Sequence, residues 1–374
     1  MAAGDPVSER PTVSVIVPAR NEEACLGACL ESLVAQTGVK FEIIVVDDGS
    51  TDRTREIAKS FAGVRVVEPA PLPLGWIGKN NALVAGAKAA RGEWLLFTDA
   101  DTVHRGGSLA RSVEEARRQK AALLSYSPEQ EVHGFWEKAV MPVIFAELAS
   151  SYRPSDVSDP ASSAAAANGQ YILISREAYD AVGGHETIAT SLLEDVALAR
   201  AVKASGRKIF FRYGKDAVRT RMYRSFAQLR EGWTKNLALL FPSPRRLALL
   251  RLTEFVLIVS SVTVAIVMEM KGRTPASAAV GLLALALTDL FLRRIRKAHF
   301  SWDATVLALI GLPLFSYLLL RSRNAYQKGS VTWKGRRYMG NRTCASVETN
   351  QVEAGRPLDS QQDAGRAPSH ATSI

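Results

Sequence analysis

Short apolar runs, rich in β-branched residues, alternate with segments of helical spacing in the N-terminal part of the chain, and this restricts the possible folds more than any other feature. The runs contain almost no alternating polar residues, as expected of strands buried on both faces. Strands that alternate with helices form parallel sheets covered by those helices. We therefore predict an α/β fold with a Rossmann-like, mostly parallel sheet. The expected strands are 12–18, 41–46, 64–68 and 93–101, and the expected helices are 21–36, 50–62 and 80–92.

Acidic residues stand at the ends of two of these strands. Asp47 and Asp48 end one strand, and Asp99 and Asp101 end another. Ligands of parallel sheets bind beyond the carboxyl ends of the strands, so the fold would collect these acids at one edge. Side chains two positions apart on an extended segment point to the same side, which would direct Asp99 and Asp101 at one site. Open sets of hard oxygen ligands suit Mg²⁺ or Mn²⁺ bound to phosphate, although such acids can also be solvated turn residues.

Three segments occur in order at these strand ends, namely VSVIVPARNEE, VVDDGSTDRT and FTDADT. With them the sequence resembles the family 2 glycosyltransferases over about residues 12–235, which implies the GT-A form of the α/β fold. The resemblance implies that Asp47 or Asp48 contacts the nucleotide base. It implies that Asp99 touches the ribose or the metal and that Asp101 binds the metal. The nucleotide pocket would also be lined by the PARNE segment, with Pro18, Ala19, Arg20 and Glu22.

A second acidic pair, Glu194 and Asp195, starts an expected helix over 194–206. In the family that the sequence resembles, an acidic pair here supplies the general base. We assign this role to Asp195, with Glu194 as second choice or partner, because a carboxylate can act in this way when its surroundings raise its proton affinity. The plainer interpretation is that both acids only stabilise the N-terminus of the helix. The resemblance implies an inverting, metal-dependent transfer of a sugar from a UDP-linked nucleotide-sugar to a hydroxyl of a lipid or lipid-linked acceptor.

Lys79 follows a glycine directly before an expected helix. Glycine lets the backbone approach a ligand, and an ammonium group there can lie near phosphate, so we expect Lys79 in the nucleotide-sugar site. The alternative is a solvated lysine at a helix entry. The surrounding GW-x-GKN and the downstream WKGRRY (333–338) resemble the membrane-associated glycosyltransferases linked to hopanoid and carotenoid modification.

The segment QLREGW departs from the Q-x-x-R-W signature of many processive polysaccharide synthases. Gln228, Arg230 and Trp233 are present with altered spacing, so we expect transfer of a single sugar and keep a processive synthase as the alternative. Arg230 and Trp233 are predicted to close over the diphosphate, or else to anchor an interfacial helix. A catalytically silent, membrane-bound nucleotide-sugar-binding protein is the alternative from another functional class.

Two features of the catalytic region allow two interpretations each. His185, in the segment GGHE, is either a turn residue or a contact for the acceptor. Residues 133–149 form either a membrane-surface helix that guides a lipid acceptor or a buried helix.

Three apolar runs of about membrane-spanning length follow, at 252–268, 276–292 and 304–320. The formal net charge is +10 without a nucleic-acid-binding motif, so a membrane and a lipid acceptor are the expected partners, with the oligomeric state left open. The N-terminus lacks the apolar region of a signal peptide, and we expect a multi-pass protein of the cytoplasmic membrane whose catalytic domain faces the cytosol. Basic residues lie both before and after the third run, and basic residues favour the cytosolic side. Three crossings would put these two groups on opposite sides of the membrane, so they cannot both be cytosolic.

These patterns predict five regions along the chain. The expected regions are a disordered N-terminus (1–11), a GT-A domain with interfacial segments (12–244), a membrane region of two to three apolar helices (245–322), a basic juxtamembrane segment (323–340) and a disordered tail (341–374).

Overall fold

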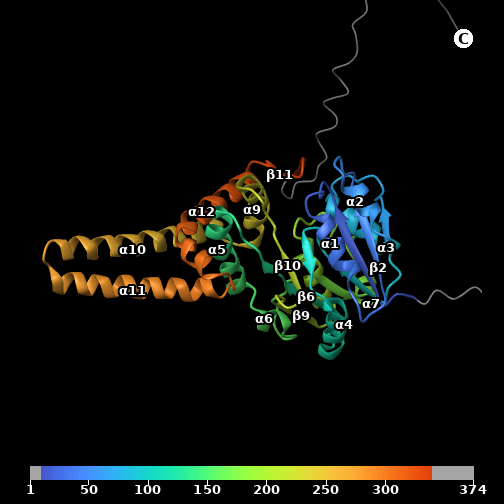
Figure 1. Cartoon of the computed structure of the whole chain (residues 1–374), viewed down its shortest axis with the longest axis horizontal. Coiled ribbons are helices and arrows are strands. Elements are labelled where there is room, and N and C mark those ends of the chain that lie inside the picture. The colour runs from blue at the N-terminus through green and yellow to red at the C-terminus, as the bar shows by residue number, and fades with distance from the viewer. Residues whose placement is uncertain (1–9, 339–374) are drawn as a thin grey trace, which may run out of the picture. The chain divides into compact units, whose positions relative to one another are not determined.

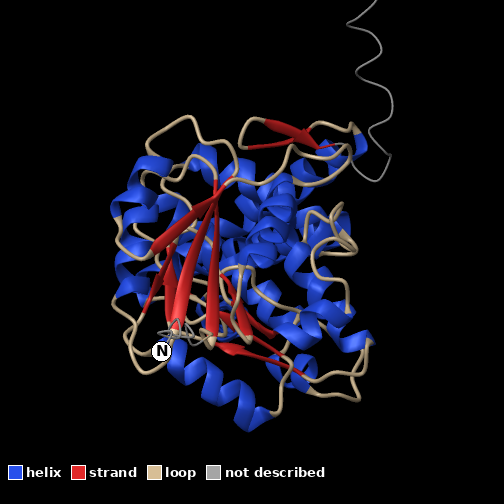
Figure 2. Cartoon of the chain, turned by 90° about the vertical axis from the view of Figure 1, so that its right-hand side faces the viewer, coloured by secondary structure: helices blue, strands red, loops and turns tan. Residues whose placement is uncertain are grey.

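A seven-stranded sheet with helices on both faces lies at the centre of the computed structural model, which describes residues 10–338 (Figure 2). Its strand order is β3-β2-β1-β4-β8-β6-β9, and neighbouring strands are parallel except where β8 pairs with β4 and β6. The prediction of a mostly parallel α/β sheet is confirmed. The predicted tail 341–374 lies outside the described residues. The strands of this sheet are β1 (Val13–Ala19), β2 (Phe41–Asp47), β3 (Val64–Val67), β4 (Trp94–Phe97), β6 (Leu123–Ser127), β8 (Ile172–Ser175) and β9 (Ile209–Tyr213).

Apolar side chains fill both faces of the sheet, which is why its strands are mostly apolar. Along β1, Val15 and Val17 face one hydrophobic cluster and Ile16 faces the other, as the alternation of side chains requires. Helices α1, α2 and α4 cover the first face, and α3, α7 and α8 cover the second. These helices are α1 (Leu26–Val34), α2 (Thr54–Ser60), α3 (Gly78–Ala89), α4 (Ser108–Gln119), α7 (Arg176–Ala181) and α8 (Glu194–Ala204); the short α6 (Pro154–Ser158) lies beside β9.

The register of the sheet brings the carboxyl ends of β1, β2 and β4 together. Ala19 at the end of β1 lies opposite Asp47 at the end of β2, and Ile16 lies opposite Phe97, the last residue of β4. The backbone N–H of Asp48 donates to the carbonyl of Ala19 at 2.9 Å and extends the pairing into the loop. The acids that follow these strands therefore share one edge of the sheet, as predicted.

The chain turns after β4, so the strand expected over 93–101 is present but shorter than predicted. The strand ends at Phe97, and a turn follows in which the N–H of Thr102 donates to the carbonyl of Asp99 at 3.2 Å. The chain bends because the next strand pairs in a separate small sheet of order β5-β10-β7. A turn, not an extended segment, presents Asp99 and Asp101. The strands of the small sheet are β5 (Thr102–His104), β7 (Glu129–Gln130) and β10 (Val218–Thr220).

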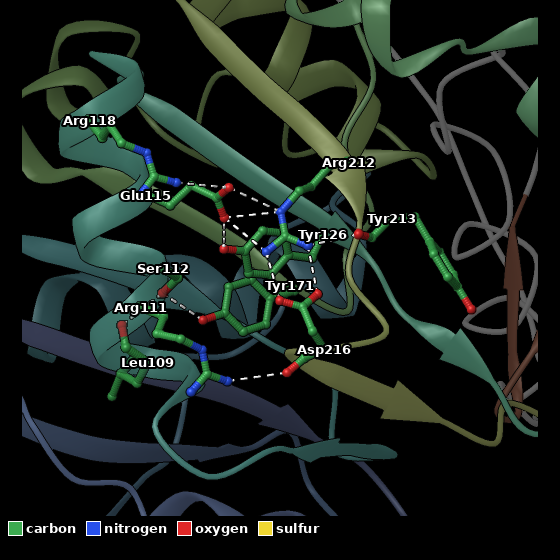
Figure 3. A network of polar contacts seen from close by, with 10 residues as sticks. All are labelled: Leu109, Arg111, Ser112, Glu115, Arg118, Tyr126, Tyr171, Arg212, Tyr213 and Asp216. Atoms are coloured by element: carbon green, nitrogen blue, oxygen red, sulfur yellow. Dashed lines mark hydrogen bonds and ion pairs between the residues drawn. The ribbon is translucent and has the colours of Figure 1, made fainter.

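A network of polar contacts ties the end of β9 to helix α4 (Figure 3). Arg212 donates to Glu115 at 2.9 Å and to Asp216 at 2.7 Å, and its guanidinium lies 4.2 Å from the ring centre of Tyr126. Because side chains alternate along a strand, the adjacent Tyr213 points away from this network and lines the cavity described below. The network thus holds one wall of that cavity in place.

The C-terminal half adds long helices that pack around α5, so residues 135–149 belong to a helix that is mostly buried, apart from the exposed Phe135 and Trp136 at its start. Helix α12 lies against α5 and α9, whereas α10 and α11 run antiparallel and extend away from the other elements (Figure 1). All three of α10, α11 and α12 are long and apolar enough to cross a membrane, but half of the most apolar window of α12 is buried, against 11% in α10 and 17% in α11. These helices are α5 (Phe135–Ser151), α9 (Phe226–Leu240), α10 (Pro244–Met270), α11 (Thr274–Arg296) and α12 (Trp302–Gln327).

A cluster of four charges joins the base of α10 and α11 to α5. Arg251 lies 2.9 Å from Glu147 and 2.8 Å from Glu254, and Arg294 lies 2.7 Å from Glu254 and also pairs with Glu147. None of the four side chains is more than 21% exposed. Two acids and two arginines therefore neutralise one another, and Glu254 is paired although it stands within an apolar run.

Candidate active site

A cavity of about 820 Å³ opens at the carboxyl edge of the sheet, beside the ends of β1, β2 and β4. Its walls also include the segment 166–170, the start of α8, and parts of α5 and α9. The structure brings together most of the site residues predicted from the sequence, although they come from distant parts of the chain. The predicted residues that line it are Pro18, Ala19, Arg20, Glu22, Asp48, Lys79, Asp99, Asp101, Glu194, Asp195 and Trp233.

Lys79 connects the two acidic groups of the cavity. Its Nζ lies 2.6 Å from Oδ1 of Asp99 and 2.7 Å from Oε1 of Glu194. Burial alone would lower the pKa of Lys79, but the two carboxylates raise it well above its usual value, so the ammonium group stays charged. The neighbouring Asn80 fixes this arrangement, because its Nδ2 donates to three backbone carbonyls of the loop 188–191 at 2.9 to 3.0 Å. The start of α3 is thereby tied to the loop that leads into α8.

Asp195 lies in the first turn of α8, as predicted. Its Oδ2 accepts a hydrogen bond from the N–H of Gly169 at 3.1 Å, and its Oδ1 accepts one from the N–H of Val196 at 2.8 Å. Burial, together with the negative charge of Glu194, raises the pKa of Asp195 to about 6. Burial acts in the same direction on Glu194, but the charge of Lys79 holds the pKa of Glu194 below its usual value. Two adjacent carboxylates thus differ in proton affinity, and Asp195 is the more basic.

The two predicted metal ligands meet on the turn after β4. Burial and the charge of Asp99 raise the pKa of Asp101 to about 7, which reflects an excess of negative charge that a cation would relieve. Within residues 10–338, no three His, Cys, Asp or Glu side chains are grouped so that they could hold a metal ion. Asp99 and Asp101 therefore fit a cation that takes further ligands from phosphate and water, as Mg²⁺ and Mn²⁺ do.

The acids after β2 have different roles in the structure. Asp48 lines the cavity, and its carbonyl accepts a hydrogen bond from Arg20 at 2.6 Å. Asp47 is fully buried, accepts from the N–H of Ser50 at 3.0 Å and pairs with Arg55 at 2.7 Å. Burial raises the pKa of Asp47, but these hydrogen bonds outweigh it and keep the pKa below its usual value. Asp47 therefore holds the loop, and Asp48 is the acid of this pair on the cavity wall.

The two predicted residues of α9 line different cavities. Trp233 is 2% exposed, lines the cavity and donates through Nε1 to the sulfur of Met141 at 3.3 Å. Arg230 lies beside the buried stripe of α9 and lines a separate cavity of about 650 Å³ next to α12. Its guanidinium is 5.9 Å from the ring centre of Phe226. The structure thus brings Trp233, but not Arg230, to the cavity of the acids.

His185 is a core residue. It is 1% exposed, its Nδ1 lies 3.0 Å from the hydroxyl of Tyr179, and its ring packs edge-on against Phe97. Burial lowers the pKa of His185 to about 4, so the imidazole is neutral. Of the two interpretations, the turn residue is the right one, since His185 lies in the turn over 182–190, although its side chain is buried there and does not line the cavity.

Several residues of the cavity were not predicted from the sequence. The backbone N–H of Gly169 donates a hydrogen bond to the carboxylate of Asp195. Lys235 of α9 also lines the cavity, and burial lowers its pKa. Lys334 and Arg336 reach the cavity from beyond α12. Their segment, K-G-R within WKGRRY, has a glycine between two basic residues, which is a signal for a tight turn that presents charge.

Comparisons with known proteins identify a family domain and similar proteins. Residues 14–183 match the family described as glycosyl transferase family 2. The chain is 29% identical over 338 residues to the 4,4'-diaponeurosporenoate glycosyltransferase of Staphylococcus aureus strain MRSA252, an alignment that covers 87% of this chain and 88% of the relative. A solved mannosyltransferase from Pyrobaculum calidifontis, in complex with GDP-Man and Mn²⁺, shares the fold with a TM-score of 0.50 and 18% identity, over 85% of this chain and 87% of that one.

Proposed function

Because the chain is a glycosyltransferase with a family 2 domain, we propose that it transfers one sugar from a UDP-linked donor to a hydroxyl group of an apolar lipid, with inversion and with a divalent cation. The observation that carries the proposal is the composition of one cavity. Acids suited to a cation and a diphosphate, an acid of raised pKa, and apolar side chains of α5 and α9 all line it.

The donor would lie along the strand ends, with its base beside Asp48 and its diphosphate beside Asp99 and Asp101. These two acids would hold Mg²⁺ or Mn²⁺, which offsets the charge of a diphosphate and makes it a better leaving group. Lys79, already 2.6 Å from Asp99, adds a second positive charge. A GDP-linked donor is the competing choice, because the structurally similar mannosyltransferase is in complex with GDP-Man.

In the proposed reaction the acceptor hydroxyl gives its proton to Asp195, and its oxygen attacks the anomeric carbon from the face opposite the diphosphate. A new carbon–oxygen bond forms while the bond between the sugar and the diphosphate breaks, and the electron pair of that bond leaves with UDP. The pKa values support the choice of base. Asp195, with a pKa of about 6, can accept a proton near neutral pH, whereas Glu194 is held in its ionised form by Lys79.

An apolar acceptor fits the far wall of the cavity. Phe145 and Leu148 of α5, Tyr152 directly after it, and Leu240 of α9 line it, and these two helices pack against α12. The apolar part of an acceptor embedded in the bilayer could therefore stay out of water while its reacting group reaches Asp195. The relatives from Staphylococcus aureus are named for 4,4'-diaponeurosporenoate, and we propose a carotenoid-type lipid as the acceptor here too.

That name also favours a second candidate reaction. Its ending denotes the anion of a carboxylic acid, and a carboxylate acceptor has no proton to lose. Asp195 would then not act as a base, and removal of its charge would change the rate little. The effect of a substitution at Asp195, developed in the Discussion, separates the two reactions.

The activity can be tested with membranes that contain the full chain, incubated with labelled UDP-sugars, labelled GDP-sugars and a lipid extract. A labelled lipid whose mass has increased by one sugar supports the proposal. A ladder of sugars would indicate the processive synthase, and binding of UDP without turnover would indicate the silent binding protein. Absence of both turnover and nucleotide binding would refute the proposed function.

We further propose that α10 and α11 cross the cytoplasmic membrane as a pair, while α12 stays with a cytosolic catalytic domain. Residues after α12 contact the strand-end loops, since Lys334 pairs with Glu22 and Arg336 with Asp48. Both ends of the apolar region therefore belong on one side, which requires an even number of crossings. Two crossings also return the basic residues 293–297 and those after α12 to the cytosolic side.

Labelling of single cysteines tests this topology. Lys271 lies between α10 and α11, Lys328 follows α12, and both are exposed. In a chain without its natural cysteines, Lys271→Cys should react with an impermeant maleimide added to intact cells, and Lys328→Cys should react only after the membrane is opened. Labelling of position 328 from outside would refute the two-crossing topology.

A further inference from the structure

A β-hairpin after the last apolar helix reaches the nucleotide side of the cavity, and the function proposed above does not account for it. Strands β11 (Val331–Trp333) and β12 (Arg336–Tyr338) are antiparallel, with Trp333 opposite Arg336. Lys334 and Gly335 form the turn, with φ angles of 46° and 76°. A lysine is uncommon in this left-handed conformation, which glycine, asparagine and aspartate adopt more easily. The choice of lysine therefore points to a use for its side chain.

Both basic side chains of the hairpin contact the loops predicted to bind the nucleotide. Lys334 donates to the carbonyl of Arg20 at 3.1 Å and pairs with Glu22. Arg336 binds both carboxylate oxygens of Asp48, one of them at 3.1 Å. A two-point contact of this kind is the geometry in which guanidinium groups recognise carboxylates and phosphates alike.

The start of α3 is shaped to admit Arg336. A Cβ atom placed on Gly78 would lie 1.6 Å from Nη1 of Arg336, so the guanidinium occupies space that any other residue at position 78 would make it leave. The next residue is Lys79, which adds a positive charge. The first backbone N–H groups of a helix such as α3 have no hydrogen-bond partner within the helix. Three cationic groups, Lys79, Lys334 and Arg336, thus line one cavity. This concentration of positive charge suits a polyanion such as a diphosphate.

The hairpin is also held by contacts that do not involve these charges. Val331 is fully buried, and Trp333 packs against the hydrophobic cluster of α5, α9 and α12. The ring of Trp333 lies 5.2 Å from Nζ of Lys235. Substitutions of Lys334 or Arg336 should therefore leave the hairpin in place.

We propose that Lys334 and Arg336 are positioning residues for the donor, which exchange the carboxylates of Glu22 and Asp48 for the diphosphate oxygens of a bound nucleoside diphosphate. The inference rests on the proposed function, because it requires a nucleotide-diphosphate donor. The exchange closes the hairpin over the diphosphate and frees Asp48 for the nucleotide base. In this way the segment after the membrane helices completes the donor site.

The experiment is calorimetric binding of UDP and of uridine to the full chain in detergent, with Mg²⁺ at constant concentration. Lys334→Gln and Arg336→Gln should each weaken UDP binding by about tenfold and uridine binding by less than about twofold, because only UDP carries the diphosphate. Arg336→Lys should recover part of the loss. Lys328→Gln, which removes an exposed lysine outside this cavity, is the matched control and should bind UDP as the wild type does.

Several outcomes would overturn the inference. Equal losses for UDP and uridine would indicate a structural role of the hairpin, and tighter UDP binding would indicate that it blocks the site. If the wild type binds UDP and both glutamine variants bind it equally well, the inference fails while the proposed function stands. If the wild type does not bind UDP, the UDP-linked donor of the proposed function fails and the inference with it.

Discussion

Replacement of Asp195 by asparagine tests the proposed base with the smallest change in shape. The carboxylate accepts two backbone hydrogen bonds, from Gly169 and Val196. Asparagine has one acceptor oxygen, so one of these N–H groups loses its partner, at a cost to folding of about 1 to 3 kcal/mol. Loss of a general base slows a reaction by about 10² to 10⁴, which corresponds to about 3 to 5 kcal/mol in the barrier. The expected effect on the rate is therefore larger than the effect on folding.

The assay is the single-turnover rate of sugar transfer with the donor at saturation. UDP affinity, measured on the same preparation, separates a loss of chemistry from a loss of the folded site, and we expect it to change little for Asp195→Asn. The matched control is Glu186→Gln, which removes an exposed acid of the preceding loop that pairs with Lys88. This control should keep its rate within about twofold, as is usual for surface substitutions away from the site.

A rate for Asp195→Asn within tenfold of the wild type, with UDP affinity unchanged, would refute the assignment of the base. Glu194→Gln then distinguishes the remaining explanations. A large loss at Glu194 would move the role of base to that residue. Little loss at either position would favour the carboxylate acceptor, which has no proton to remove.

Three other predictions concern the site and the charged cluster at the base of α10 and α11. Because the raised pKa of Asp195 is about 6, kcat/KM for the acceptor should fall tenfold per pH unit below about pH 6, where the side chain is protonated, and level off above it; a flat profile from pH 5 to 8 would contradict this. EDTA should abolish transfer and Mn²⁺ or Mg²⁺ should restore it, and Asp101→Asn should raise the metal concentration for half-maximal activity by at least about tenfold, measured by titration. Arg294→Ala should destabilise the chain by about 3 kcal/mol, because it leaves Glu147 and Glu254 with only one arginine as partner. This loss should lower the melting temperature in detergent. The control Arg293→Ala, which removes only an exposed ion pair, should melt as the wild type does.

The sequence was sufficient to predict the sheet and most of the residues at its edge. Strands such as β1 are almost entirely apolar, with Ser14 as the exception, because both faces are covered, and their order in a parallel sheet brings their carboxyl ends to one edge. The placement of Asp48, Asp99 and Asp101 on one cavity follows from that topology alone. The prediction that these acids share a cavity did not depend on the conformation of residues 98–101. We expected a strand there, and Asp99 and Asp101 reach the cavity from a turn.

The parts that could not be predicted have weak local signals. Strands β5, β7 and β10 are two or three residues long, too short for any periodicity, and they form only by pairing with one another across distant parts of the chain. The different positions of Trp233 and Arg230 depend on which stripe of α9 is buried. The packing of α5 and α12 against α9 decides which stripe is buried. This packing cannot be inferred from the sequence of α9 alone.

The number of membrane crossings illustrates the same limit. An apolar helix can be apolar because lipid surrounds it or because protein does, and composition cannot separate the two causes. Helix α12 matches α10 and α11 in length and apolar character, yet half of its most apolar window is covered by protein. The conflict between three apolar runs and the basic residues on either side of the third is removed once α12 is assigned to the protein interior. The contacts of Lys334 and Arg336 with Glu22 and Asp48 then support an even number of crossings, because residues that touch across a cavity cannot face opposite sides of a bilayer.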